Sequence, residues 1–116
     1  MAHNAEGSLR SGIKDEKLAQ VWEFRTSPLF TDAERVALEF AIAAASQPND
    51  VTDDLFDHMK RHWTEGQIVE ITALVAFFGF MNRFNDTMAT PLESEPAETA
   101  EKHIAQHGWK IGKHAR

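Results

Sequence analysis

The chain has 116 residues, enough for one compact domain, and 42% of them are hydrophobic, as in ordinary soluble globular proteins. Its formal net charge is −6, and no long run of lysine or arginine is present, which argues against nucleic acid as a partner. Cysteine is absent, and this excludes disulfides, thiolate metal ligands and a cysteine nucleophile within these residues. The first residues lack the apolar core of a signal peptide, so we expect a cytoplasmic protein.

Helical patterns recur along the first half of the chain, whereas strand alternation and hairpin turns are missing. The first predicted helix spans residues 14 to 25 and ends at a Ser-Pro pair, because proline disfavours helix in the residue before it. Thr31 and Glu34 form a capping-box pattern that predicts a second helix, which the sequence SQPND ends. Thr52 caps a short third helix that continues through Met59.

The longest predicted helix runs from about Gln67 to Met88 and opens with a second capping box, formed by Thr64 and Gln67. Its apolar stretch, residues 68 to 81, is shorter than the roughly 20 residues of a membrane span. We therefore expect no membrane association and a helix buried at the centre of a bundle or in an interface, because it is apolar nearly all round.

The C-terminal part is predicted to contain an acidic loop at 89–96, a helix at about 97–107 that ends at Gly108, and a basic tail at 109–116. The whole chain, residues 1–116, is therefore interpreted as a single all-α domain, a bundle of five to six helices.

Polar residues follow the most apolar part of the long helix. Arg83 can reach Asp86, three residues further on, and Asn82 shares a helix face with Asp86. These residues are interpreted as a polar clamp that fixes the helix end, with a pocket-lining role as the alternative.

Asp54, His58 and His62 recur every four residues, so one helix face carries a weak candidate site for zinc or nickel. A solvated helix face is the preferred interpretation, and neither a metal nor another cofactor is expected.

The remaining aromatic and imidazole side chains are interpreted structurally. Trp22 and Trp63 are expected to be core or interface anchors. The C-terminal histidines, His103, His107 and His114, are expected to be exposed.

The segments LFTDAERVALEFA and VTDDLFDHMKRHWTEGQIVEITALVAFFGFMNRFN, with the closing GWKIGKH, resemble the second half of an alkylhydroperoxidase D (AhpD)-like protein of the carboxymuconolactone decarboxylase family. The similarity covers residues 12 to 88 and, less closely, the tail. It implies an AhpD-like helical fold and a peroxidase-type antioxidant oxidoreductase.

Active members of that family use a Cys-x-x-Cys pair, a histidine that follows it and an upstream glutamate. The segment AHNAEGSLRSGIKDEKL resembles the stretch directly after the pair, with His3 in the place of the motif histidine. Both cysteines and the glutamate would then precede Met1. Either the coding region is truncated or the protein is a shortened relative without the thiol chemistry.

Three functions remain open from the sequence. The first is an inactive fragment or remnant of a dithiol peroxidase, in which His3 is the matching catalytic position. The second is a non-catalytic helical module that oligomerises or binds an apolar ligand. The third is lactone decarboxylation, for which no convincing site is present.

Self-association is also expected, since the long helix needs more covering surface than the short helices offer. The interface should include Val75, Phe78 and Phe80 or their neighbours. The family resemblance implies a dimer, trimer or hexamer.

Overall fold

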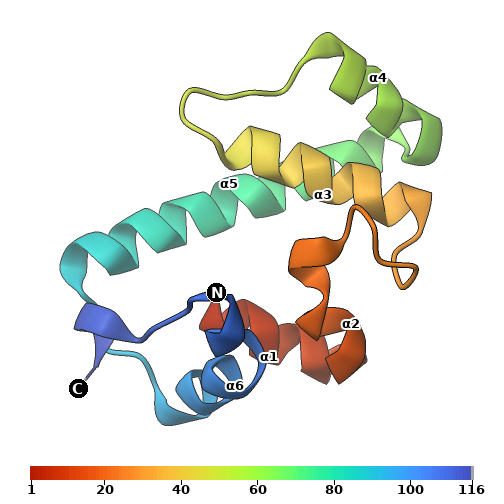
Figure 1. Cartoon of the computed structure of the whole chain (residues 1–116). Coiled ribbons are helices and arrows are strands. Elements are labelled where there is room, and N and C mark those ends of the chain that lie inside the picture. Colours follow the sequence, from red (N-terminus) through yellow and green to blue (C-terminus); the bar gives the residue numbers. More distant parts are fainter. Residues whose placement is uncertain (116) are drawn as a thin grey trace. The chain divides into compact units, whose positions relative to one another are not determined.

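The computed structural model describes residues 1 to 115 (Figure 1). It contains six α-helices and three short 3-10 helices, and no strand occurs in this part of the chain. The predicted all-α fold is therefore confirmed. The single domain expected from the sequence divides into two compact units, Met1–Leu29 with Asn85–Arg116, and Phe30–Phe84, which are described separately.

The first unit combines the two ends of the chain. Its elements are α1 (Ala2–Arg10), α2 (Asp15–Ala19), η1 (Val21–Glu23), the end of α5, α6 (Ser94–Ile104), η2 (Ala105–His107) and η3 (Gly112–His114). Small side chains from α1 and α6 share one apolar cluster with α2, made of Ala2, Ala5, Leu18, Ala100 and Ile104. Alanines allow helices to approach closely, so α1 and α6 form the centre of this unit.

Several boundaries in the first unit differ from the sequence predictions. Helix α1 was not predicted, because small and polar residues dominate its sequence and no side chain caps its start. The helix expected at 14–25 is broken into α2 and η1, and α6 begins at Ser94, inside the expected acidic loop. The helical stretch does end at Gly108, as predicted, where a φ of 89° suits glycine. The basic tail contains η3.

The second unit consists of α3 (Asp32–Ala45), α4 (Asp53–His62) and most of α5 (Glu65–Met88). All three predicted caps are present. The Thr31 hydroxyl accepts from the amide of Glu34 in a complete capping box, and Thr52 accepts from Leu55. Gln67 and Thr64 exchange a reciprocal pair of bonds of 2.9 and 3.2 Å at the start of α5.

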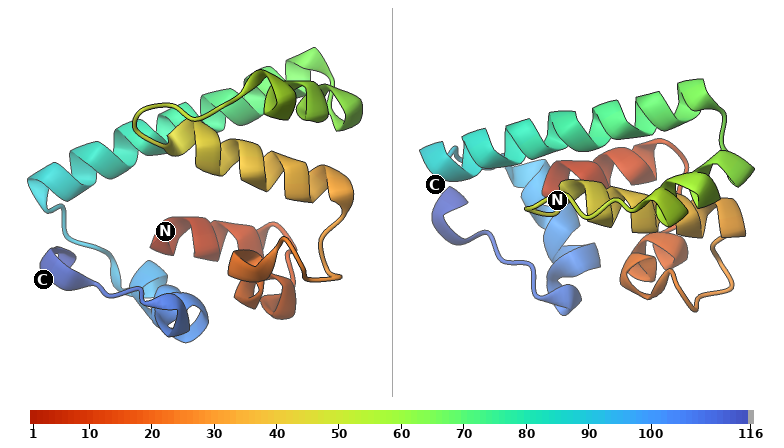
Figure 2. Two further views of the ribbon diagram at one scale, coloured as in Figure 1. Left: turned by 45° about the horizontal axis from the view of Figure 1, so that its top comes forward. Right: turned by 90° about the horizontal axis from the view of Figure 1, so that it is seen from above.

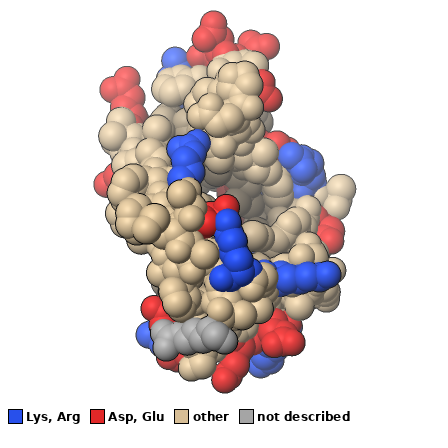
Figure 3. Space-filling model, turned by 90° about the vertical axis from the view of Figure 1, so that its left-hand side faces the viewer, with Lys and Arg blue, Asp and Glu red and all other residues tan. Residues whose placement is uncertain are grey.

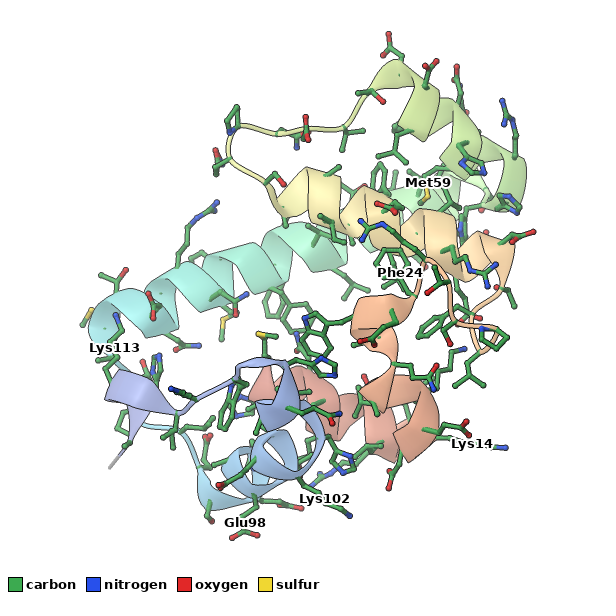
Figure 4. All side chains as sticks on the ribbon, viewed as in Figure 1. Lys14, Phe24, Met59, Glu98, Lys102 and Lys113 are labelled. Atoms are coloured by element: carbon green, nitrogen blue, oxygen red, sulfur yellow. The ribbon has the colours of Figure 1, made fainter. Side chains whose placement is uncertain are left out.

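The core of the second unit is a cluster of Val36, Phe40, Met59 and Ile68, one or two residues from each helix. Met59 is completely buried (Figure 4). Trp63 packs against this cluster, and its indole N–H donates to the carbonyl of Ala33 at 3.0 Å. This confirms the interpretation of Trp63 as a core anchor.

Helix α5 is a single unbroken helix of 24 residues (Figures 1 and 2). The prediction that it lies at the centre of a bundle is wrong for the described residues, whereas the alternative, a place in an interface, stays a prediction. Within the described chain only Ile68 of α5 is fully buried. The reason is that α3 and α4 contact its first turns, whereas the apolar residues continue far beyond them. By length and composition α5 also meets the criteria of a membrane span, which the core helix of a soluble protein can meet as well.

Replacing Met59 with alanine tests whether the second unit depends on this cluster. Removal of a fully buried Met side chain leaves a cavity, and it should lower the free energy of unfolding by about 2 to 5 kcal/mol. Urea unfolding followed by circular dichroism measures the change. Ile42→Ala, at a half-exposed position of α3, is the matched control and should change the stability by no more than about 0.5 kcal/mol. Equal losses from the two variants would contradict the assigned core.

Candidate functional site

The polar edge where α1 meets the start of α6 carries the candidate site. His3 lies on the first turn of α1, and Glu93 is the residue directly before α6. The Nε2 atom of His3 lies 2.9 Å from Oε2 of Glu93. Because the alanine-rich contact fixes α1 beside α6, these two residues meet although 90 positions separate them in the sequence.

The His3–Glu93 contact is a hydrogen bond between an imidazole and a carboxylate. With a proton on Nε2, the imidazole donates to the carboxylate, which orients the ring and leaves Nδ1 available as a base. The side chains are 61% and 62% exposed, so the pair can exchange protons with water or with a ligand.

A second set of ion pairs supports the same edge. Arg10, on the last turn of α1, contacts Glu6 within its own helix and Glu95 of α6, the latter at 2.8 Å. The hydrogen bond to Glu95 and the charge of Glu6 raise the pKa of Arg10. Burial lowers the pKa of the Met1 amino group at the start of α1. The Arg10–Glu95 pair therefore adds to the α1–α6 contact that brings His3 next to Glu93.

The predicted polar clamp on α5 has different partners from those expected. Asp86 pairs with Nζ of Lys113 at 3.3 Å and with Nε2 of His114 at 3.5 Å, and no ion pair joins it to Arg83 within residues 1 to 115. Arg83 and Asn82 are both exposed. Asp86 therefore anchors the tail that contains Lys113 (Figure 4), and the expected Arg83–Asp86 contact is wrong.

The candidate metal ligands do not converge on one point. Asp54, His58 and His62 are exposed on α4, and the two imidazole rings lie 5.5 Å apart. Among the described residues, no group of three or more His, Asp or Glu side chains is arranged to hold a metal ion. The three side chains are exposed to solvent on this helix face.

The C-terminal histidines are structural, and the prediction that they are exposed is wrong. His103 is buried on α6. His107 stacks on Trp22 with 4.2 Å between ring centroids and donates from Nε2 to the carbonyl of Ala19 at 2.9 Å. His114 bonds to the carbonyl of Thr90. These contacts join distant segments, so no local sequence signal could have shown them; the same holds for Glu93.

The fold defines the class of protein: it is all-α and consistent with the AhpD-like helical family. Two crystal structures of the debrominase Bmp8, one without ligand and one of a cysteine-to-alanine variant in complex with 2,3,4-tribromopyrrole, share this fold with a TM-score of 0.80 and 33% sequence identity. The match covers 87% of this chain and 54% of Bmp8.

The uncharacterised protein YnjA of Escherichia coli (strain K12) is also similar, with 40% identity over 84 residues. These residues are 72% of this chain and 46% of YnjA, so the chain spans about half the length of both relatives. No family model matches the sequence.

Substitution of Asp86 by asparagine tests its role as the tail anchor. Without the charge, Lys113 and His114 lose their ionic partner, although His114 keeps its bond to the carbonyl of Thr90, and η3 should open more readily. Amide hydrogen exchange of residues 112 to 114 is expected to become faster. Asp57→Asn, which removes an ion pair with Lys60 on α4, is the control and should leave exchange in the tail unchanged. Unchanged protection of η3 in the Asp86 variant would contradict this role.

Proposed function

We propose that this chain is one half of an AhpD-like oxidoreductase, in which His3 and Glu93 transfer protons to and from thiols supplied from outside these 116 residues. The observation that carries the proposal is the 2.9 Å contact between the two side chains. His3 is the position that resembles the histidine of the family motif, and the contact provides that histidine with a carboxylate partner.

The likeness to Bmp8 supports an enzyme of this class. Bmp8 is a debrominase, and its cysteine-to-alanine variant forms a complex with a brominated pyrrole. The chain spans about half of that protein, which agrees with a site to which a second portion of protein contributes. Hydroperoxides are the proposed substrates on the family resemblance, and halogenated aromatic compounds are the alternative that Bmp8 supports.

The chemistry explains why the chain alone should be inactive. In peroxide reduction, a thiolate attacks one peroxide oxygen and the other oxygen leaves as water or alcohol after protonation. A second thiol then displaces hydroxide from the sulfenate and forms a disulfide, which a dithiol donor reduces. The four methionines cannot form this disulfide. His3 and Glu93 can move the protons of these steps, but no residue here can supply the sulfur.

The first test is an assay of the chain as it stands. Purified protein, mixed with a hydroperoxide and a dithiol regenerating system, should consume peroxide only at the background rate. The consumption of the dithiol is the measurement. Turnover above background in a preparation free of contaminating thiol enzymes would show that the reaction uses a site other than a dithiol.

The second test supplies the missing thiols. A version extended at the N-terminus with a Cys-x-x-Cys segment that ends three residues before His3 should reduce peroxide. In that version, His3→Gln or Glu93→Gln should lower the rate by roughly 100-fold or more, in the range of general acid–base contributions.

The matched control for the extended version is Glu95→Gln. Glu95 lies on the same edge and binds Arg10 instead of His3, so its substitution should leave the rate nearly unchanged. An extended version that stays inert, or one that loses equal activity in the Glu93 and Glu95 variants, would remove the support for the His3–Glu93 proposal.

A non-catalytic assembly module is the second candidate function, and the exposed apolar surface of α5 favours it. On this view the His3–Glu93 pair joins α1 to α6 and has no chemical role. The inert outcome of the extended version would make this candidate the better one.

A further inference from the structure

The segment that joins α5 to α6 carries Glu93 at its end and is held by the C-terminal tail. His114, in the tail, contacts this segment twice. Its Nδ1 atom lies 2.9 Å from the carbonyl oxygen of Thr90, and its own carbonyl accepts from the amide of Leu92 at 3.0 Å. The backbone that His114 binds therefore directly precedes Glu93.

The imidazole ring of His114 is fixed at both of its nitrogen atoms. A carbonyl oxygen can only accept a hydrogen bond, so Nδ1 carries a proton and donates to Thr90. Nε2 lies 3.5 Å from Oδ1 of Asp86, which also pairs with Nζ of Lys113. Basic and acidic side chains also adjoin on the face drawn in Figure 3. The ring therefore cannot turn without losing a contact on one side.

The same segment passes through an unfavourable backbone conformation. Ala89 has a φ of 50°, in the left-handed region where glycine is usual after a helix. For another residue, such a conformation persists only when surrounding contacts impose it. The amide of Thr90 donates to the carbonyl of Asn85 at 3.0 Å, and the carbonyl of Thr90 accepts from His114. The turn is thus held by α5 on one side and by the tail on the other.

The side chain of Glu93 is not fixed by its own helix. Glu93 is the N-cap residue of α6, a position where a side chain commonly accepts from an amide of the first turn. In the described chain it makes no such capping bond, and its Oε2 atom lies 2.9 Å from Nε2 of His3. The direction of this side chain therefore depends on the backbone of residues 90 to 92.

We propose that His114 is a positioning residue that holds Glu93 at bonding distance from His3. It acts through the backbone, by its bonds to Thr90 and Leu92. The consequence for catalysis rests on the proposed function, whereas the effect on the contact between the two side chains does not.

The first test observes the imidazole ring of His3 by nuclear magnetic resonance in the 116-residue chain, at constant pH. Glu93→Gln defines the ring signals of His3 when the carboxylate is lost. His114→Ala removes the bond to Thr90 and should move the His3 signals from their wild-type positions toward those of Glu93→Gln. Circular dichroism of each variant shows whether the fold is kept.

Two matched variants separate positioning from a general loosening of the first unit. His107→Ala removes a bond of the same kind and the same length of 2.9 Å, to the carbonyl of Ala19 in that unit, and should leave the His3 signals unchanged. His114→Asn keeps a nitrogen donor on Cγ, where Nδ1 is attached, and should retain the wild-type signals.

The second test uses the version extended with a Cys-x-x-Cys segment. There, His114→Ala should lower kcat by roughly 10- to 100-fold with little change in KM, because a misplaced catalytic group slows the reaction more than it weakens binding. The double variant with Glu93→Gln should be no slower than Glu93→Gln alone, since both changes remove one interaction.

Three results of the first test would overturn the proposal. They are His3 signals that His114→Ala leaves in place, an equal movement in His107→Ala, and a failure of His114→Asn to retain the wild-type signals. Multiplied losses of rate in the double variant would also contradict it, because His114 would then act independently of Glu93. An extended version that is inert in every form would count against the proposed function alone, and the ring signals would still decide whether His114 positions Glu93.

Discussion

The apolar contact among Val36, Phe40, Met59 and Ile68 is the interaction on which the second unit depends. It brings α3, α4 and the beginning of α5 together, and it fixes the direction in which α5 leaves the cluster. Because α5 is far longer than the surface it meets there, most of its apolar residues extend beyond the contact. The same geometry therefore gives α5 a well-packed anchor at one end and an uncovered apolar surface along the rest. The first gives the unit its stability, and the second leaves a large apolar surface exposed.

The first unit holds the two ends of the chain together. Small residues bring α1 close to α6 along a seam of alanines. Polar contacts at the edge of this seam, His3–Glu93 and Arg10–Glu95, fix how the two helices align. The same arrangement that positions His3 against Glu93 therefore also stabilises the unit.

The sequence predicted the elements whose signals are local. Capping boxes at Thr31 and Thr64 and the glycine stop at Gly108 depend on residues three or four positions apart, and all three are present. Helix α1 gave no such signal, because alanine, glycine and polar residues dominate it. The structure needs α1 because α6 packs on it, and that contact joins opposite ends of the chain.

The residues of the candidate site were also predictable only in part. His3 could be named from a resemblance, whereas Glu93, its partner, lies in a loop with other acidic residues and has no distinguishing pattern. Asp86 was expected to contact a neighbour on its own helix, but its charge is satisfied by the tail. The exposure of α5 could not be read from its composition, because an apolar helix in a core and one in an interface have the same sequence pattern.

The alanine seam between α1 and α6, formed by Ala2, Ala5 and Ala100, also limits which substitutions this sequence can accept during evolution. Ala100 is completely enclosed, and Ala2 and Ala5 are almost so. A larger side chain at any of these positions would force the two helices apart, at a typical cost of about 1 to 3 kcal/mol. The cluster around Met59 is made of larger, adaptable side chains, where one apolar residue can replace another of similar volume. Substitutions between apolar residues should therefore be tolerated around Met59 in related sequences. Along the α1–α6 seam only the smallest residues should be accepted, so the two ends of the chain are the portion least free to vary.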